Sequence, residues 1–121
     1  MGRLIFGFLM LLVPLSALAD GPNCTGTESY PASMAFTFLK NAGVVDNSKV
    51  DFSKTKVIRL ASEQIGKDLY RQVHYIVFFY KSGSNVSVIT VNDASMEECS
   101  MSEVQVYEIK ERLDGRHGSH A

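Results

Sequence analysis

LYRQVHYIVFFYK, residues 69–81, is the longest β-prone stretch of this chain and decides its fold. Side chains alternate between the two faces of a strand, so one face of this stretch carries four apolar side chains: Val73, Tyr75, Val77 and Phe79. The other face carries a mixed set: Tyr70, His74, Ile76, Phe78 and Tyr80. Apolar residues on both faces predict a central strand with a helix packed on one of them.

Three further strands flank this stretch in the sequence. The alternation of residues 54–62 predicts a strand before it, joined to it by a turn or bulged connection over residues 63–68. Ser82-Gly83-Ser84-Asn85 is typical of a tight hairpin turn and leads into a strand over residues 86–92. A polar loop, residues 93–102, then precedes a last strand over residues 103–109.

A helix is predicted ahead of the strands, over residues 30–42. Ser29 can cap its first turn, and Pro31 lies where a missing N–H costs nothing. Gly43 suits the left-handed backbone conformation that ends many helices. One stripe of this helix is apolar at helical spacing and needs a sheet to pack against: Tyr30, Met34, Ala35, Phe38, Leu39 and Ala42.

These elements predict an α+β fold, with one N-terminal helix packed on a four-stranded antiparallel meander. The layout resembles that of the cystatins, in which a curved sheet follows a helix. The resemblance is one of layout only, because Gln64-Ile65-Gly66 does not match the Q-x-V-x-G hairpin of cystatins and the chain has no tryptophan. We expect a single domain over residues 29–113, after an irregular lead-in at 20–28 and before a flexible tail at 114–121.

The first 19 residues have the layout of a secretory signal peptide. Arg3 supplies the positive start, an apolar run follows, and Ala17-Leu18-Ala19 forms the cleavage site before Asp20. The apolar run is shorter than the about 20 residues that a membrane span needs, so we expect no stable membrane insertion after cleavage. The sequence therefore predicts a periplasmic or secreted protein.

Cys24 and Cys99 are the only two cysteines of the chain. In an exported protein an even number of cysteines predicts disulfide bonding, and two cysteines allow one pairing. No C-x-x-C or Cys/His cluster accompanies either residue, which disfavours a reactive thiol or a metal ligand. We expect the bond to tie the start of the mature chain to the loop before the last strand.

Sequence motifs for catalysis and cofactor binding are missing. The chain has no nucleophile elbow, no phosphate-binding glycine loop and no calcium-loop spacing, so we expect no cofactor and no metal. It carries 12 basic and 13 acidic residues without a basic stripe, which argues against nucleic acid as a partner. These observations favour a binding protein over an enzyme.

The partner of such a protein is expected to be another protein, and the concrete forms are an inhibitor of an envelope enzyme and an immunity protein against a toxin. One helix cannot cover both faces of the sheet, so some of Ile76, Phe78 and the two flanking tyrosines should stay partly exposed or be covered by self-association. The alternative is that sheet curvature and the loop at 44–53 cover them. Four residues are the candidate partner contacts, two aromatic and two acidic: Tyr70, Tyr80, Glu97 and Glu98. The alternative is a ligand-binding or enzymatic domain, in which the sheet lines a pocket around His74.

Overall fold

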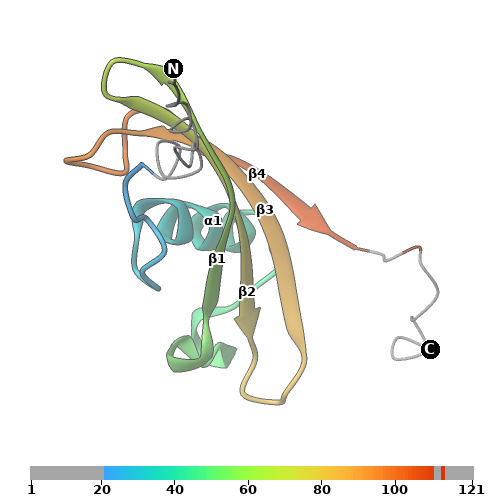
Figure 1. Cartoon of the computed structure of the whole chain (residues 1–121). Helices are drawn as coiled ribbons and strands as arrows, with labels where there is room; N and C mark the ends of the chain where they lie inside the picture. The colour runs from blue at the N-terminus through green and yellow to red at the C-terminus, as the bar shows by residue number, and fades with distance from the viewer. Residues whose placement is uncertain (1–20, 111–112, 114–121) are drawn as a thin grey trace, which may run out of the picture.

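The computed structural model describes residues 21–110 and Leu113. Figure 1 shows one helix, α1 (Tyr30–Asn41), beside a four-stranded antiparallel sheet. The strands lie side by side in chain order: β1 (Lys56–Gly66), β2 (Leu69–Phe79), β3 (Asn85–Ala94) and β4 (Gln105–Ile109). The α+β class and the four-stranded antiparallel sheet are thereby confirmed. The predicted signal peptide (1–19) and the predicted tail (114–121) lie outside the described residues.

Local interactions define both ends of α1. At the start, the Ser29 hydroxyl oxygen accepts a hydrogen bond from the backbone N–H of Ala32, and Pro31 occupies the first turn. At the end, Gly43 adopts a φ of 77°, where a side chain would be strained. The backbone N–H of Val44 then donates to the Leu39 carbonyl oxygen at 2.8 Å, which closes the helix.

β1 is longer than the sequence predicts and continues to Gly66. Two bulges interrupt its pairing with β2, one between Arg59 and Ala61 and one between Gln64 and Gly66. The connection to β2 is therefore only two residues long, and the predicted turn at 63–68 is too wide. Residues 63–66 are polar or exposed because β1 is an edge strand. They lack the alternation of apolar residues that predicts a strand, so the sequence does not assign them to β1.

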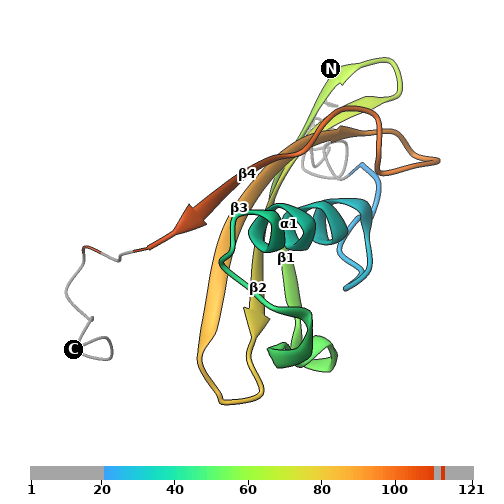
Figure 2. The same ribbon diagram turned by 180° about the vertical axis from the view of Figure 1, so that it is seen from behind.

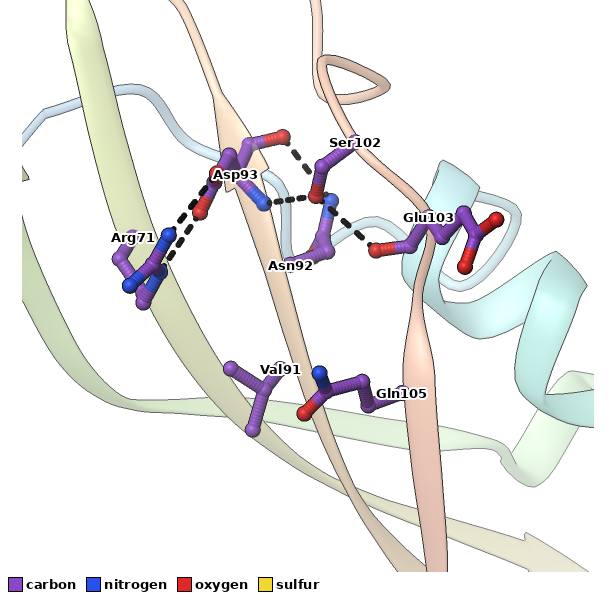
Figure 3. A pocket seen from close by; sticks show the side chains of 7 residues that line it. All are labelled: Arg71, Val91, Asn92, Asp93, Ser102, Glu103 and Gln105. Atoms are coloured by element: carbon purple, nitrogen blue, oxygen red, sulfur yellow. Dashed lines mark hydrogen bonds and ion pairs between the residues drawn. The ribbon is translucent and has the colours of Figure 1, made fainter.

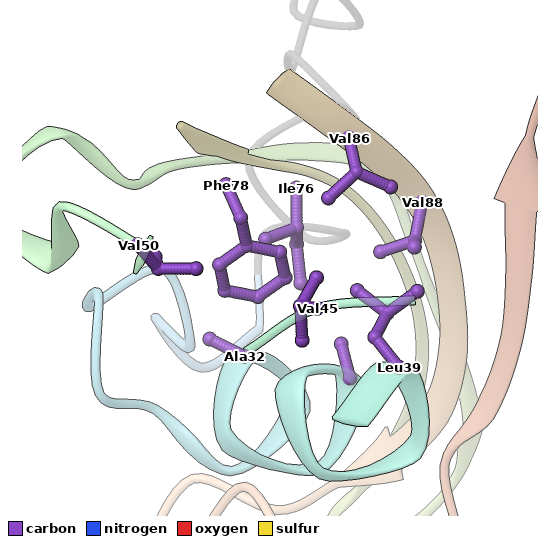
Figure 4. Packing of buried hydrophobic residues seen from close by; sticks show 9 residues of the cluster. Ala32, Leu39, Val45, Val50, Ile76, Phe78, Val86 and Val88 are labelled. Atoms are coloured by element: carbon purple, nitrogen blue, oxygen red, sulfur yellow. The ribbon is translucent and has the colours of Figure 1, made fainter. Parts of the chain in front are cut away.

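α1 packs on the face of β2 that carries Ile76 and Phe78, as Figure 4 shows. Both side chains are buried, with exposed fractions of 0% and 2%, whereas Tyr70 and Tyr80 on the same face are half-buried, so only the two tyrosines of this set stay partly exposed. They form the core with side chains from the helix, from the segment that follows it and from β3: Ala32, Ala35, Leu39, Val45, Val50, Val86 and Val88. The opposite face of the sheet, here called the open face, is turned toward the viewer in Figure 1, with α1 behind the strands.

Two short 3-10 turns link α1 to β1 and close one end of the core. η3 (Asn47–Lys49) begins at Asp46, and η4 (Phe52–Lys54) begins at Asp51. Each aspartate accepts hydrogen bonds from the backbone N–H and the hydroxyl of the serine two residues later. These bonds lower the pKa of both carboxyl groups, so both stay ionised in the folded protein.

Candidate functional site

The loop between β3 and β4, residues 95–104, projects beyond the sheet in Figures 1 and 2. A disulfide bond joins Cys99 in this loop to Cys24, which lies ahead of α1, and the Cα atoms are 5.8 Å apart. The predicted disulfide is confirmed. We call residues 95–104 the stapled loop, because the bond fixes its middle to the start of the domain.

Ser95 organises the tip of the stapled loop. Its hydroxyl oxygen accepts hydrogen bonds from the backbone N–H groups of Glu97 and Glu98, each at 3.2 Å. Its own backbone N–H donates to the Glu98 carbonyl oxygen at 2.8 Å, which closes a tight turn. The backbone N–H of Met96 donates to Oδ1 of Asp68, in the β1–β2 turn, at 3.0 Å. The tip is therefore attached to a neighbouring turn as well as to itself.

The base of the stapled loop is held by the end of β3. Nδ2 of Asn92 donates to the Cys99 carbonyl oxygen at 2.7 Å. The Asp93 carbonyl oxygen accepts from the backbone N–H of Met101 at 2.9 Å, and the Asp93 N–H donates to the Ser102 hydroxyl oxygen at 2.8 Å. These bonds attach the loop to β3, an inner strand of the sheet. The loop therefore has little conformational freedom left to lose on binding.

The side chains at the tip point outward and are apolar and acidic. Met96 and Met101 have exposed fractions of 59% and 45%, high for residues of this type. Glu97 and Glu98 are also exposed. Within the described residues, neither carboxylate of this pair takes part in a hydrogen bond or ion pair. The four side chains therefore add little to the stability of the fold and are available to a partner.

An open pocket of about 400 Å³ lies beside the base of the stapled loop (Figure 3). Arg71 and Asp93 form a two-pronged ion pair across it, with Nε to Oδ1 at 2.9 Å and Nη2 to Oδ2 at 3.2 Å. These hydrogen bonds raise the pKa of Arg71. Five further residues complete the lining: Val91, Asn92, Ser102, Glu103 and Gln105. The pocket can receive a polar side chain of a partner next to the loop.

The two candidate tyrosines lie at opposite ends of β2, on the face that α1 covers. Tyr70 is half-buried, and its ring lies so close to Gly21 that a methyl group there would be 2.7 Å from Cδ2. Tyr80 is half-buried too, and its hydroxyl donates to the Val44 carbonyl oxygen at 2.9 Å. Tyr80 follows the end of β2 that is far from the stapled loop. Tyr70 is in register with Ala94, the residue before the stapled loop, whereas Tyr80 lies at the other end of the strand.

His74, the residue of the alternative hypothesis, is completely buried under the helix-covered face. It lies between Arg59 of β1 and Thr90 of β3 in the register of the sheet. Burial, with a smaller contribution from the positive charge of Arg59, lowers the pKa of His74 to about 4. The imidazole is therefore neutral at pH 7. It lines neither the pocket of Figure 3 nor the three other described pockets.

Reasoning from the sequence alone missed Met96, Met101 and the anchoring role of Asp68. A signal for the turn was present, since serine followed by exposed polar residues favours a hydroxyl that accepts N–H bonds two and three residues on. The bond from Met96 to Asp68 spans 28 residues and had no sequence signal. Exposed methionines cannot be told from buried ones until the loop is placed.

Comparison of the chain with protein-family models, curated proteins and solved structures finds no match. Over the described residues, no helix has both the length and the apolar character to cross a membrane. Within the same residues, no three side chains of the His, Cys, Asp or Glu type come together as a metal site. The candidate site therefore rests on the geometry of the stapled loop.

Proposed function

We propose that this chain is a small exported protein that binds another protein through the stapled loop. One observation carries this proposal: two exposed methionines and two exposed glutamates, Met96, Met101, Glu97 and Glu98, lie on the same loop. The disulfide bond and the hydrogen bond to Asp68 hold that loop in place. Binding loops on rigid scaffolds have this character, because such a loop is ordered before it binds and loses little conformational entropy on binding.

The chemistry of the tip indicates the kind of surface that it fits. Methionine side chains adapt to irregular apolar surfaces and are common at binding sites. The two adjacent carboxylates favour a partner with a positively charged cleft, and they accelerate encounter with it. The pocket beside the loop, with its Arg71–Asp93 pair, gives a partner side chain a second point of contact.

Export supports the same proposal. A cleaved signal peptide over residues 1–19 and the Cys24–Cys99 bond both suit a periplasmic or secreted protein. Two concrete forms of the function are an inhibitor of an envelope-attacking enzyme and an immunity protein that blocks a toxin.

Site-specific photocrosslinking in cells that make the full chain tests the proposal. A photoreactive phenylalanine analogue replaces Met96 in one variant and Phe38 in a control, because Phe38 is also exposed, at 42%, but lies on α1. We expect one discrete protein adduct at position 96 and none at position 38. The adduct at position 96 should disappear when Glu97→Lys and Glu98→Lys are added. Equal labelling at both positions, or adducts that ignore the charge reversal, contradicts the proposal.

A second candidate function rests on four buried polar atoms that have no hydrogen-bond partner among residues 21–110: Gln72 Oε1, His74 Nδ1, His74 Nε2 and Thr90 Oγ1. Buried polar atoms of native proteins are nearly always paired, so a cluster of unpaired ones supports a small polar ligand at this place. Native mass spectrometry of the mature protein, purified without denaturant, tests this function. A bound small molecule lost in His74→Phe supports it, and a bare protein mass contradicts it.

A further inference from the structure

The open face of the sheet is apolar across all four strands. Its central row runs across the sheet in register: Ile58, Tyr75, Ile89 and Tyr107. Ile58 and Tyr107, on the two edge strands, have exposed fractions of 50% and 56%. No described element of the chain packs over this row, since α1 lies on the other face. A contiguous apolar surface of this kind is typical of an interface.

The neighbouring rows make this face complementary to itself. The next row toward the stapled loop is Ala61, Val73, Val91 and Gln105, whose members are smaller or unbranched, and Leu60, exposed at 56%, lies in the bulge beside Ala61 at its edge. Consider a two-fold axis that lies midway between these two rows and runs parallel to them, across the strands. This axis places the row of Tyr75 in one copy over the row of Val73 in the other. Each strand then lies over its own counterpart. The two aromatic side chains of each copy meet valine or glutamine of the other, which lets the surfaces interlock.

Charges at the two ends of the open face are complementary under the same axis. Lys56 lies at one end, in register with Val77, and Glu63 lies at the other end, in register with Arg71. Arg71 is already paired with Asp93, so Glu63 is the remaining acidic group of its row. The axis carries Lys56 of one copy to Glu63 of the other, and the reverse, which gives two equivalent ion pairs.

We propose that a second copy of this chain covers the open face, with the two sheets packed face to face and the rows running in opposite order. Strand and row spacings give a footprint of roughly 500 Å² for each copy, near the lower limit for a specific interface. The dimer is therefore weak and reversible. The stapled loops remain uncovered at its opposite ends. The pocket beside each loop, lined by Arg71, Val91 and Gln105, lies on the covered face, so a partner reaches the loop in the dimer but reaches the pocket only in the monomer.

Sedimentation velocity of the mature, oxidised protein over 5–500 µM (about two decades of concentration) tests this proposal, because a weak dimer shows itself as a shift with concentration. We expect Tyr107→Ser and Ile58→Ser each to weaken dimerisation by roughly tenfold, as expected for lost apolar contacts. Phe38→Ser, at an exposed position on α1, should leave dimerisation unchanged.

Charge reversal distinguishes this arrangement from other contacts. Lys56→Glu and Glu63→Lys should each weaken the dimer, and the double variant Lys56→Glu with Glu63→Lys should recover it. The two residues are far apart along β1 in one chain, so recovery requires contact between copies. A protein that stays monomeric at all concentrations overturns the proposal, and so does a double variant as weak as the singles. Loop variants at Glu97 and Glu98 should dimerise normally, which separates this test from that of the proposed function.

Discussion

The backbone N–H of Met96 donates a hydrogen bond to Oδ1 of Asp68 at 3.0 Å, which ties the tip of the stapled loop to the turn between β1 and β2. The two residues belong to different connections, and each connection is exposed to solvent. Together with the Cys24–Cys99 bond, this contact holds the loop at two points, residues 96 and 99. A loop held in this way keeps one shape before it meets a partner.

Removing the Asp68 carboxylate should loosen the tip of the loop. In Asp68→Ala, the Met96 N–H loses its acceptor, and local opening becomes easier by about 1 kcal/mol, which corresponds to about fivefold faster amide exchange. Hydrogen exchange of residues 95–98, followed by NMR, measures this change. Asp68→Asn keeps an oxygen in the same position and serves as the control with a smaller effect. Unchanged exchange in Asp68→Ala would show that the disulfide alone orders the tip.

Removing the disulfide should destabilise the whole domain. The bond closes a loop with a sequence separation of 75 residues. In the chain-entropy model, this closure contributes about 4 kcal/mol to the free energy of unfolding. Urea unfolding of the paired variant Cys24→Ser with Cys99→Ser should show a loss of this order. Mass spectrometry of the native protein should show two hydrogens fewer than the reduced form. Two titratable thiols in the native protein would contradict the bond.

His74 should make folding sensitive to acid. Its pKa is about 4 in the folded protein and 6.5 as a free side chain, so between these values the unfolded chain binds a proton that the folded chain does not. The contribution of His74 to the free energy of unfolding should therefore not change with pH above 6.5. It should fall by roughly 3 kcal/mol as the pH is lowered from 6.5 to 4.

Urea unfolding at several pH values measures this dependence, with His74→Gln as the comparison. The variant lacks the titrating group, so the difference between the two proteins should change with pH only between about 4 and 6.5. Parallel curves for the two proteins would contradict a buried, neutral His74. Asp46 and Asp51 are present in both proteins, and their lowered pKa values cancel in the difference.

Tyr80 should contribute to stability and not to partner binding. Tyr80→Phe removes the hydrogen bond to the Val44 carbonyl oxygen and should cost about 1 kcal/mol in the free energy of unfolding. Tyr107→Phe removes an exposed hydrogen bond to Gln105 and should change stability by less than about 0.5 kcal/mol. Thermal unfolding of both variants gives the comparison. A larger loss in Tyr107→Phe would contradict the assignment of roles.

Parts of the fold that depend on local chemistry were predictable from the sequence. Ser29 and Pro31 define the start of α1, and the two cysteines allow a single pairing. The face of β2 that α1 covers was not predictable, because both faces are apolar and alternation alone does not distinguish them. The residue at which β1 ends was not predictable for a related reason. Its bulges and polar edge residues lack the pattern of a buried strand.

The candidate site was only half predictable for the same physical reason. Glu97 and Glu98 stand out in the sequence as an acidic pair in a loop before the last strand, and the structure keeps them exposed. Tyr70 and Tyr80 stand out as aromatic residues, yet their exposure depends on which face the helix takes. Tyr80 lies far from the loop because it follows the opposite end of β2.

Titration calorimetry with the protein crosslinked at Met96 tests the central claim most directly. The native chain should bind that protein with a measurable affinity. The variant carrying Glu97→Lys and Glu98→Lys should lose at least about 1.4 kcal/mol of binding free energy, which is tenfold in Kd. The Tyr80→Phe variant should bind like the native chain. Equal affinities for the native chain and the charge-reversed loop would contradict the claim that the stapled loop is the binding site.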